Sequence, residues 1–150
     1  MEKKNLSMEV FDPVRNTWEV TDPIPETGFI LGSAILGGCI YLMRHVGDHI
    51  GWLRFSTSTQ QWDALHTIPI PQFNHLSELV QFNCIAVGTR IFVVQVWGSR
   101  GNVEPRSEPG RRSGAMVLEY DPTGEEGAAW TRRAEMPIAV KGGLCTLVTC

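Results

Sequence analysis

One cluster of side chains in this sequence has the residue types of a metal site. His45, Asp48 and His49 follow one another with the spacing H-x-x-D-H. On an α-helix, histidines four residues apart share a face and can bind zinc together. Here the cluster falls in the expected link between two strands, with Gly47 and Gly51 close by. We therefore interpret it as a solvated hairpin loop and predict no metal site.

A second candidate is a polar insertion, residues 98–114, which is rich in arginine, glycine and proline. Such a composition cannot form a packed core, so we expect a surface loop. Two interpretations stay open: a loop that docks a protein partner or attracts phosphate, and a tolerated hairpin insertion whose charges aid solubility. If the loop binds a partner, the predicted contact residues are Trp97 at its base and Arg100, Arg106, Arg111 and Arg112.

The cysteines do not indicate catalysis. The four of them lack C-x-x-C spacing, and three lie in apolar strand-like runs, where a free cysteine behaves as a small hydrophobic residue. No Ser-His-Asp or Cys-His arrangement can be argued from this sequence, so we predict neither a catalytic site nor a cofactor. Without an export signal, we expect reduced thiols and a cytoplasmic or nuclear location. The cysteines are Cys39, Cys84, Cys145 and Cys150.

Charge and hydropathy argue against two classes of partner. With 13 basic and 16 acidic residues, the net charge is −3, which offers no basic field for nucleic acid and no polybasic membrane signal. Residues 27–43 carry no charge, but these 17 residues include four glycines and fall short of the ~20 apolar residues of a membrane helix. We predict neither nucleic-acid binding nor a membrane span.

An internal repeat is the strongest pattern in the sequence. Three segments each contain an aromatic residue, then a tryptophan, then a proline. The tryptophan-to-proline spacing is seven residues in all three, and the aromatic-to-tryptophan spacing is seven, seven and ten. The three sets are Phe11, Trp18 and Pro25; Phe55, Trp62 and Pro69; and Tyr120, Trp130 and Pro137.

Each repeated residue has a structural expectation. The aromatic residue should end a strand and pack towards a neighbouring sheet, and the tryptophan should add a flat surface to that packing. Asp-Pro after Phe11 and Tyr120 favours a turn, because Asp caps its own backbone and Pro presets φ. The proline should mark the exit from an outer strand, because it cannot donate to a sheet ladder.

The repeat period predicts the fold. Phe11 and Phe55 are 44 residues apart, and Phe55 and Tyr120 are 65 apart, or 51 once 14 residues are assigned to the insertion. Between these segments, Tyr41 and Phe92 hold matching places in apolar runs that follow a glycine. A period near 44 to 51 is typical of a four-stranded propeller blade. We expect strands near 8–11, 18–20, 29–36, 39–43, 52–56, 61–65, 79–87, 90–96, 115–120, 129–133 and 143–148.

These residues resemble the kelch motif over nearly the whole chain. In that family a glycine precedes an Ile-Tyr-Val-like second strand, the third strand ends in Tyr/Phe-Asp-Pro, and the fourth carries a tryptophan before a proline. Residues 9–18 are most similar to plant-type F-box/kelch proteins. The glycine doublet that closes the second strand in the family is missing after Tyr41 and after Phe92. The resemblance implies an all-β, kelch-type β-propeller segment.

The same resemblance divides the chain into blades. We expect a part-blade at 6–25, complete four-stranded blades at 26–71 and 72–138, and another part-blade at 139–150. Propellers close with about 4 to 8 blades. Two complete and two partial blades therefore suggest a fragment or shortened product of a longer kelch protein, or a chain that associates with itself to complete the ring.

The resemblance also implies a function. It predicts a non-catalytic protein–protein interaction scaffold, the substrate-binding part of an F-box/kelch ubiquitin-ligase adaptor. An F-box would precede the propeller and contact the ligase components, and the seven residues before the first expected strand give it no room. The alternative is a fragment of a kelch-fold enzyme such as an iron-dependent specifier protein. A copper-radical site is disfavoured, because Tyr41 and Tyr120 both fill repeat positions.

Overall fold

The chain is all-β throughout the part that its computed structural model describes, which is residues 8–25, 28–47, 49–69, 80–97 and 114–133. Ten strands and no helix occur in these ranges, and accordingly no described helix is long and apolar enough to cross a membrane. The all-β prediction is therefore confirmed. The predicted strand near 143–148 lies outside the described residues.

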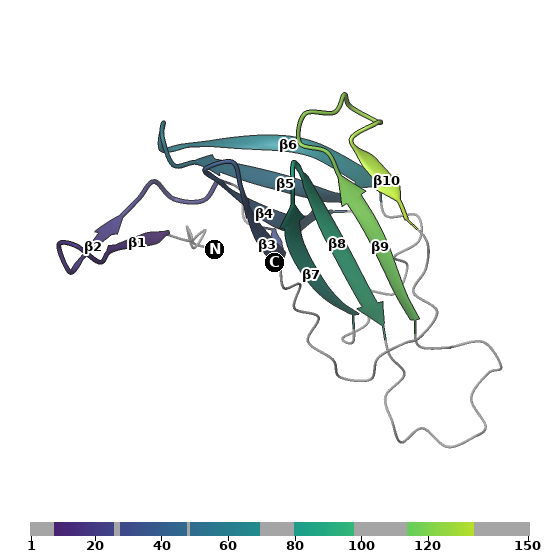
Figure 1. The fold of residues 1–150 in the computed structure, drawn as a ribbon, viewed down its shortest axis with the longest axis horizontal. Coiled ribbons are helices and arrows are strands. Elements are labelled where there is room, and N and C mark those ends of the chain that lie inside the picture. The colour runs from purple at the N-terminus through teal and green to yellow at the C-terminus, as the bar shows by residue number, and fades with distance from the viewer. Residues whose placement is uncertain (1–7, 26–27, 48, 70–79, 98–113, 134–150) are drawn as a thin grey trace, which may run out of the picture.

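The strands form three antiparallel sheets in which chain neighbours pair (Figure 1). A two-stranded hairpin comprises β1 (Glu9–Asp12) and β2 (Thr17–Val20). The first four-stranded sheet comprises β3 (Phe29–Leu36), β4 (Cys39–Val46), β5 (His49–Ser56) and β6 (Gln61–Pro69). The second comprises β7 (Val80–Val87), β8 (Arg90–Trp97), β9 (Gly114–Tyr120) and β10 (Trp130–Arg132).

The two four-stranded sheets match the two predicted blades, and the hairpin matches the outer half of a third. Several strands are longer than expected, and this overturns the interpretation of the histidine cluster as a loop. Strand β4 continues to Val46 and β5 begins at His49, so Val46 pairs with His49 and His45 pairs with Ile50. Both histidines are strand residues, because the ladder of backbone pairs continues as far as Val46 and His49.

Turn chemistry explains where strands end. The β3–β4 hairpin turns on Gly37 and Gly38, whose φ values of 57° and 73° suit the mirror-image two-residue turns that match strand twist. After β1, Asp12 Oδ1 accepts hydrogen bonds from the backbone N–H groups of Val14 and Arg15 at 2.8 and 3.1 Å. After β9, Asp121 Oδ1 accepts one from the Thr123 N–H at 2.9 Å. The predicted Asp-Pro turns are thus confirmed.

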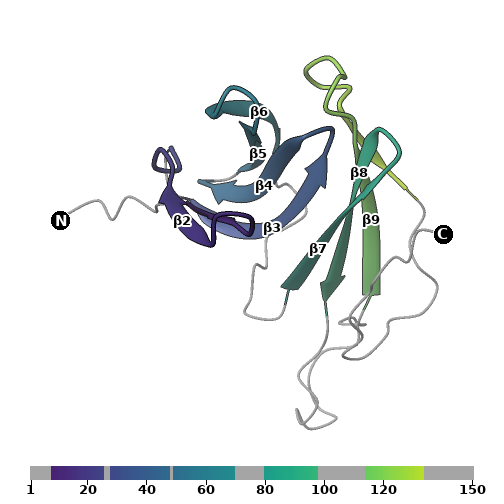
Figure 2. The same cartoon turned by 60° about the vertical axis from the view of Figure 1, so that its left-hand side comes forward.

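The core lies between the two four-stranded sheets. Figures 1 and 2 show them leaning face to face, with β3 packed against β7. Side chains alternate along each strand, and one face of each sheet enters this core. Its buried members are Ala34, Tyr41, Met43, Ile50, Trp52, Ile91, Val93, Met116, Leu118, Tyr120 and Ala129.

Gly32 sets how closely the inner strands approach. A Cβ atom added to Gly32 would lie 2.7 Å from Sγ of Cys84 on β7, far inside van der Waals contact. Cys84 is a free, half-buried thiol, and burial raises its pKa to about 12, so it stays protonated at neutral pH and packs as an apolar group.

We predict that Gly32→Ala lowers the free energy of unfolding by about 1–3 kcal/mol, the usual cost of overpacking. The free energies of unfolding of the wild type, Gly32→Ala, Cys84→Ala and the double variant, measured by chemical denaturation, form a double-mutant cycle. The cycle shows whether the cost of Gly32→Ala depends on Cys84. In the Cys84→Ala background the added methyl has room, and the Gly32→Ala cost should largely disappear. An unchanged cost in that background would show that the clash lies elsewhere.

Candidate functional site

The repeated aromatic residue and tryptophan are direct cross-strand neighbours. Phe11 pairs with Trp18, Phe55 with Trp62, and Tyr120 with Trp130. Their ring centroids lie 5.0, 4.9 and 4.9 Å apart, with interplanar angles of 42°, 49° and 46°. The sequence-based expectation that these residues pack between sheets is therefore incomplete, because their first contact is within one sheet.

The third repeat keeps this pair despite a longer spacing. Its three extra residues are accommodated in the β9–β10 turn, between Tyr120 and Trp130. Inside that turn the Asp121 N–H donates to the Ala129 carbonyl at 2.7 Å, which holds the two strands together next to the aromatic pair. The register is therefore fixed by the pair and the turn length is free to vary.

Trp52 joins the two sheets. Its side chain is 0 % exposed and stacks on Tyr120 and Trp130 of the second sheet, at centroid distances of 5.3 and 5.9 Å and angles of 28° and 17°. Tyr41 meets Trp52 edge-on, at 6.3 Å and 84°. We call these four residues the seam. Offset stacks and edge-to-face pairs are both favourable aromatic geometries.

Sequence reasoning missed Trp52. It lies three residues before Phe55, and an odd separation on a strand places two side chains on opposite faces. Trp52 therefore faces the second sheet, and Phe55 faces away from it. The signal was that this sheet has a second tryptophan besides Trp62. It lies in the third strand, at a place where the other two segments have Met8 and Val117.

Polar groups border the seam. His66 Nδ1 lies 3.1 Å from the Tyr120 hydroxyl. Burial raises the pKa of Tyr120 above that of a free phenol. Burial and the nearby Cys39 raise the pKa of Tyr41, against a hydrogen bond with Arg54 that lowers it. Both phenols are therefore neutral at physiological pH, and act as hydrogen-bonding groups rather than as nucleophiles.

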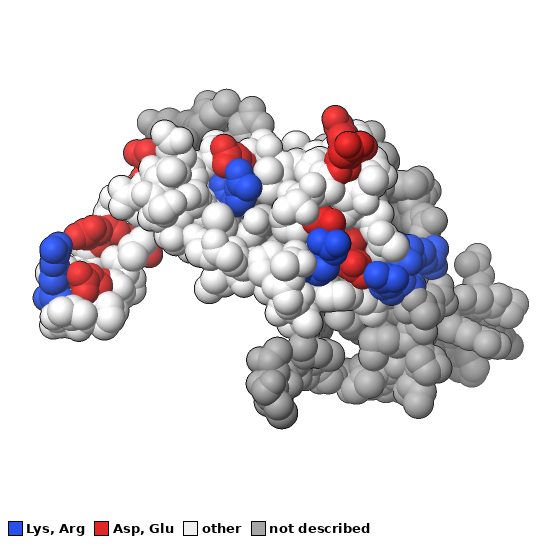
Figure 3. Space-filling view, turned by 45° about the horizontal axis from the view of Figure 1, so that its top comes forward, with Lys and Arg blue, Asp and Glu red and all other residues white. Residues whose placement is uncertain are grey.

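Ion pairs link neighbouring strands within the four-stranded sheets. Arg54 Nη2 is 2.7 Å from Asp63 Oδ2. In the second sheet Arg90 Nη1 lies 2.8 Å from Asp121 Oδ2, and a hydrogen bond from the Thr123 hydroxyl is the main cause of the lowered Asp121 pKa. In the view of Figure 3, acidic and basic side chains are interspersed over the strands. Exposed pairs of this kind contribute little to stability.

The predicted partner-binding residues are placed only in part. Trp97 is the last residue of β8, and its backbone pairs with Val80 and Gly114. The insertion therefore connects two paired neighbouring strands, and because β9 begins at Gly114, it spans residues 98–113. Arg100, Arg106, Arg111 and Arg112, like the side chain of Trp97, lie outside the described residues.

The remaining repeat residues take the following positions. Pro69 is the last residue of β6 and pairs with His49, as expected for a strand exit. Pro25 follows the hairpin, beyond the end of β2, and Pro137 lies outside the described residues. Phe92 occupies in β8 the place of Tyr41 in β4, because Phe92 pairs with Glu119 as Tyr41 pairs with Arg54. Among the described residues, no three His, Cys, Asp or Glu side chains could hold a metal ion together.

Comparison with known proteins supports the kelch resemblance. Over 95% of its length, in an alignment of 151 positions, the chain is 27% identical to an F-box/kelch-repeat protein of Arabidopsis thaliana. The chain spans 36% of the length of that relative. No family model matches the chain. Together with the all-β sheets and the repeated aromatic pairs, this similarity supports a resemblance to kelch-repeat proteins.

We predict that Trp52→Ala lowers the free energy of unfolding by about 3–5 kcal/mol, as expected for a large buried aromatic residue. Trp18→Ala is the matched control, because Trp18 also sits in a cross-strand pair but is 66% exposed. The control should cost under about 1 kcal/mol. Urea unfolding followed by circular dichroism measures both, and equal losses would contradict the assignment of Trp52 as the link between the sheets.

The buried phenol predicts an alkaline loss of stability. The pKa of Tyr120 is raised in the folded chain, so the folded chain binds this proton more tightly than the unfolded chain does. The free energy of unfolding should therefore fall as the pH rises above about 10, the ordinary pKa of tyrosine. The slope per group is at most about 1.4 kcal/mol per pH unit.

Tyr120→Phe should make this fall shallower when unfolding is measured between about pH 8 and 12, because it removes the titrating group. The variant also loses the bond to His66, at about 1 kcal/mol, so slopes rather than absolute stabilities are compared. Parallel curves for the two proteins would show that the Tyr120 proton is not held by folding.

Proposed function

Starting from its resemblance to a kelch-repeat protein, we propose that this chain is the target-binding part of an F-box/kelch ubiquitin-ligase adaptor. The observation that carries the proposal is its similarity to an F-box/kelch-repeat protein along 95% of its length. The relative's name joins an F-box to kelch repeats, and the chain aligns with 36% of that relative. Ligase recruitment is proposed to reside in another part of the full-length gene product.

The described geometry supports a binding role. The two four-stranded sheets are held by stacked aromatic rings, and both tyrosines of the seam have raised pKa values. A rigid β-scaffold of this kind presents its connections for recognition. One such connection, residues 98–113, joins the paired ends of β8 and β9. We propose that the four arginines of this connection, together with Trp97 before it, contact the target.

The test joins binding to degradation. Proteins captured by the 150-residue chain are identified by mass spectrometry, and their half-lives and ubiquitin content are then compared in cells with and without the full-length gene product. In cells that lack the full-length gene product, we expect some captured proteins to carry less ubiquitin and to have longer half-lives. Captured proteins whose turnover is unchanged would contradict the ligase role and leave a binding scaffold.

Two variants locate the target contact. Replacing Arg100, Arg106, Arg111 and Arg112 by serine, or Trp97 by alanine, should weaken capture of the same proteins at least about tenfold. Arg15→Ser, a change to an exposed basic residue of the β1–β2 turn, should leave capture unchanged. Undiminished binding by the loop variants would move the target contact to another part of the scaffold.

A further inference from the structure

The turn between β5 and β6 begins with a different kind of residue from its two counterparts. In each hairpin that joins a third strand to a fourth, the aromatic residue of the cross-strand pair is followed directly by the residue that begins the turn. That residue is Asp12 in the β1–β2 hairpin, Asp121 in the β9–β10 hairpin and Ser56 in the β5–β6 hairpin. Two of the three turns therefore begin with a carboxylate, and the third begins with a hydroxyl.

The β1–β2 and β5–β6 turns share the form of their backbone. Each comprises four residues between the last paired positions of its strands. Each also ends in a residue with left-handed backbone, which is Asn16 at φ 54° in one turn and Gln60 at φ 55° in the other. Equal length and an equal left-handed position indicate that the backbone N–H groups two and three residues into the two turns are directed alike.

These N–H groups meet a strong acceptor in one turn and a weak one in the other. Asp12 Oδ1 accepts hydrogen bonds from the N–H groups of Val14 and Arg15 at 2.8 and 3.1 Å. Ser56 Oγ accepts one from the N–H of Thr59 at 3.4 Å, which is long for a hydrogen bond. A carboxylate is also the stronger acceptor, because its charge assists the bond. The β5–β6 turn therefore directs backbone donors towards a position that lacks the negative charge of its counterpart.

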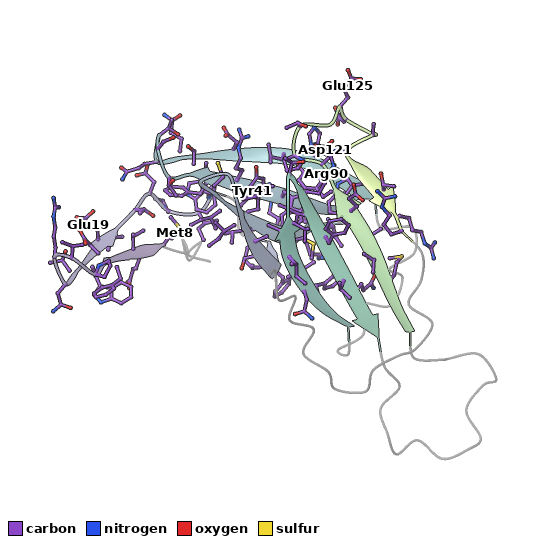
Figure 4. The ribbon with its side chains drawn as sticks, in the orientation of Figure 1. Met8, Glu19, Tyr41, Arg90, Asp121 and Glu125 are labelled. Atoms are coloured by element: carbon purple, nitrogen blue, oxygen red, sulfur yellow. The ribbon has the colours of Figure 1, made fainter. Side chains whose placement is uncertain are left out.

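The second sheet shows the same position occupied by a charge. Asp121 Oδ1 accepts hydrogen bonds from the backbone N–H and the hydroxyl of Thr123 at 2.9 and 2.7 Å, and Figure 4 labels Asp121 next to Arg90, its ion-pair partner. In the β5–β6 turn the corresponding residues are Ser56 and Ser58, whose hydroxyl oxygens lie 3.0 Å apart. Residues 56–61 carry no charged side chain, so a negative charge placed here meets no like charge within the turn.

We propose that Ser56 is a phosphorylation site. Its hydroxyl oxygen takes part in an exposed hydrogen bond, and residues 57–60 are exposed as well, so the turn is open to an enzyme. A protein kinase supplies the phosphoryl group. Ser56 Oγ forms the new bond to the terminal phosphorus of a nucleoside triphosphate, the bond to the departing diphosphate breaks, and the hydroxyl proton passes to the kinase.

Phosphate on Ser56 gives the turn the charge that its counterparts have. A phosphoserine carries about −1.5 to −2 charges at neutral pH and three strong acceptor oxygens, where Asp12 and Asp121 present a carboxylate. The backbone donors then bind an anion, and such bonds are about twice as strong as those between neutral groups. The strengthened turn holds β6 more firmly, and β6 carries His66, whose Nδ1 lies 3.1 Å from the Tyr120 hydroxyl of the second sheet.

Peptide mapping tests whether the modification occurs. The full-length gene product is isolated, with phosphatases inhibited, from cells that express it, and its phosphates are located by mass spectrometry. We expect phosphate on Ser56 and none on Thr123, whose hydroxyl is held against the Asp121 carboxylate. A product in which Ser56 carries no phosphate, or in which residues 57–59 carry it instead, would overturn the proposal.

Phosphoserine installed at position 56 of the 150-residue chain tests the physical reason. It should raise the folding equilibrium constant, measured by urea unfolding, about fivefold, and added salt should reduce this gain. Ser56→Asp, which restores the residue of the other two turns, should change the constant in the same direction. Phosphoserine at position 33, where Ser33 is an exposed residue of β3, is the matched control and should give no gain.

Two results of this measurement would contradict the proposal. One is a folding equilibrium constant that phosphate on Ser56 leaves unchanged or lowers. The other is an equal gain from phosphate on Ser33, because the gain would then come from added charge in general and not from the turn. The proposed ligase function does not depend on either experiment.

Discussion

The stacking of Trp52 between the sheets is the contact on which the described structure depends. The indole meets two rings of the second sheet and one of its own, and is fully buried. Its N–H has no hydrogen-bond partner among the described residues. The position is therefore held by apolar burial and ring geometry, and the buried, unpaired N–H is a cost that the aromatic contacts must exceed.

The cross-strand aromatic pairs fix the register of the strands, whereas Trp52 joins the two sheets. An aromatic residue and a tryptophan in register fix which residues of the third and fourth strands lie opposite each other, and thus which side chains face the core. The turn between the two strands can then change without disturbing the sheet. The β9–β10 turn does so, with three more residues than its counterparts and an unchanged Tyr120–Trp130 pair. The same logic lets an insertion follow Trp97 while β8 and β9 stay paired.

Most of the fold was predictable, because its determinants are local and repeated. Glycine turns, Asp turns and the aromatic–tryptophan spacing located all ten described strands to within a few residues. The predicted strand ends near His45 and His49 were wrong, because both histidines were assigned to a loop. Polar residues with glycines nearby resemble a loop in sequence, although the ladder of backbone pairs continues through them. Trp52 was missed because its role depends on contact with Tyr120 of the other sheet. The repeated motif describes residues within one sheet and does not extend to that contact. The proposed binding residues were inferred from composition, and the described structure places only the backbone of Trp97.

Comparison of the pairs shows that the repeated motif is not by itself a buried unit. Phe11 with Trp18 and Tyr120 with Trp130 have nearly the same centroid distance and tilt, but Phe11 is 42% exposed and Tyr120 is 0 % exposed. The difference is the neighbouring sheet, which supplies Trp52 and Tyr41 to one pair and nothing described to the other. In the second sheet, therefore, the Tyr120–Trp130 pair fixes the register and the neighbouring sheet contributes its burial. Stability in such an array comes largely from interfaces between adjacent units.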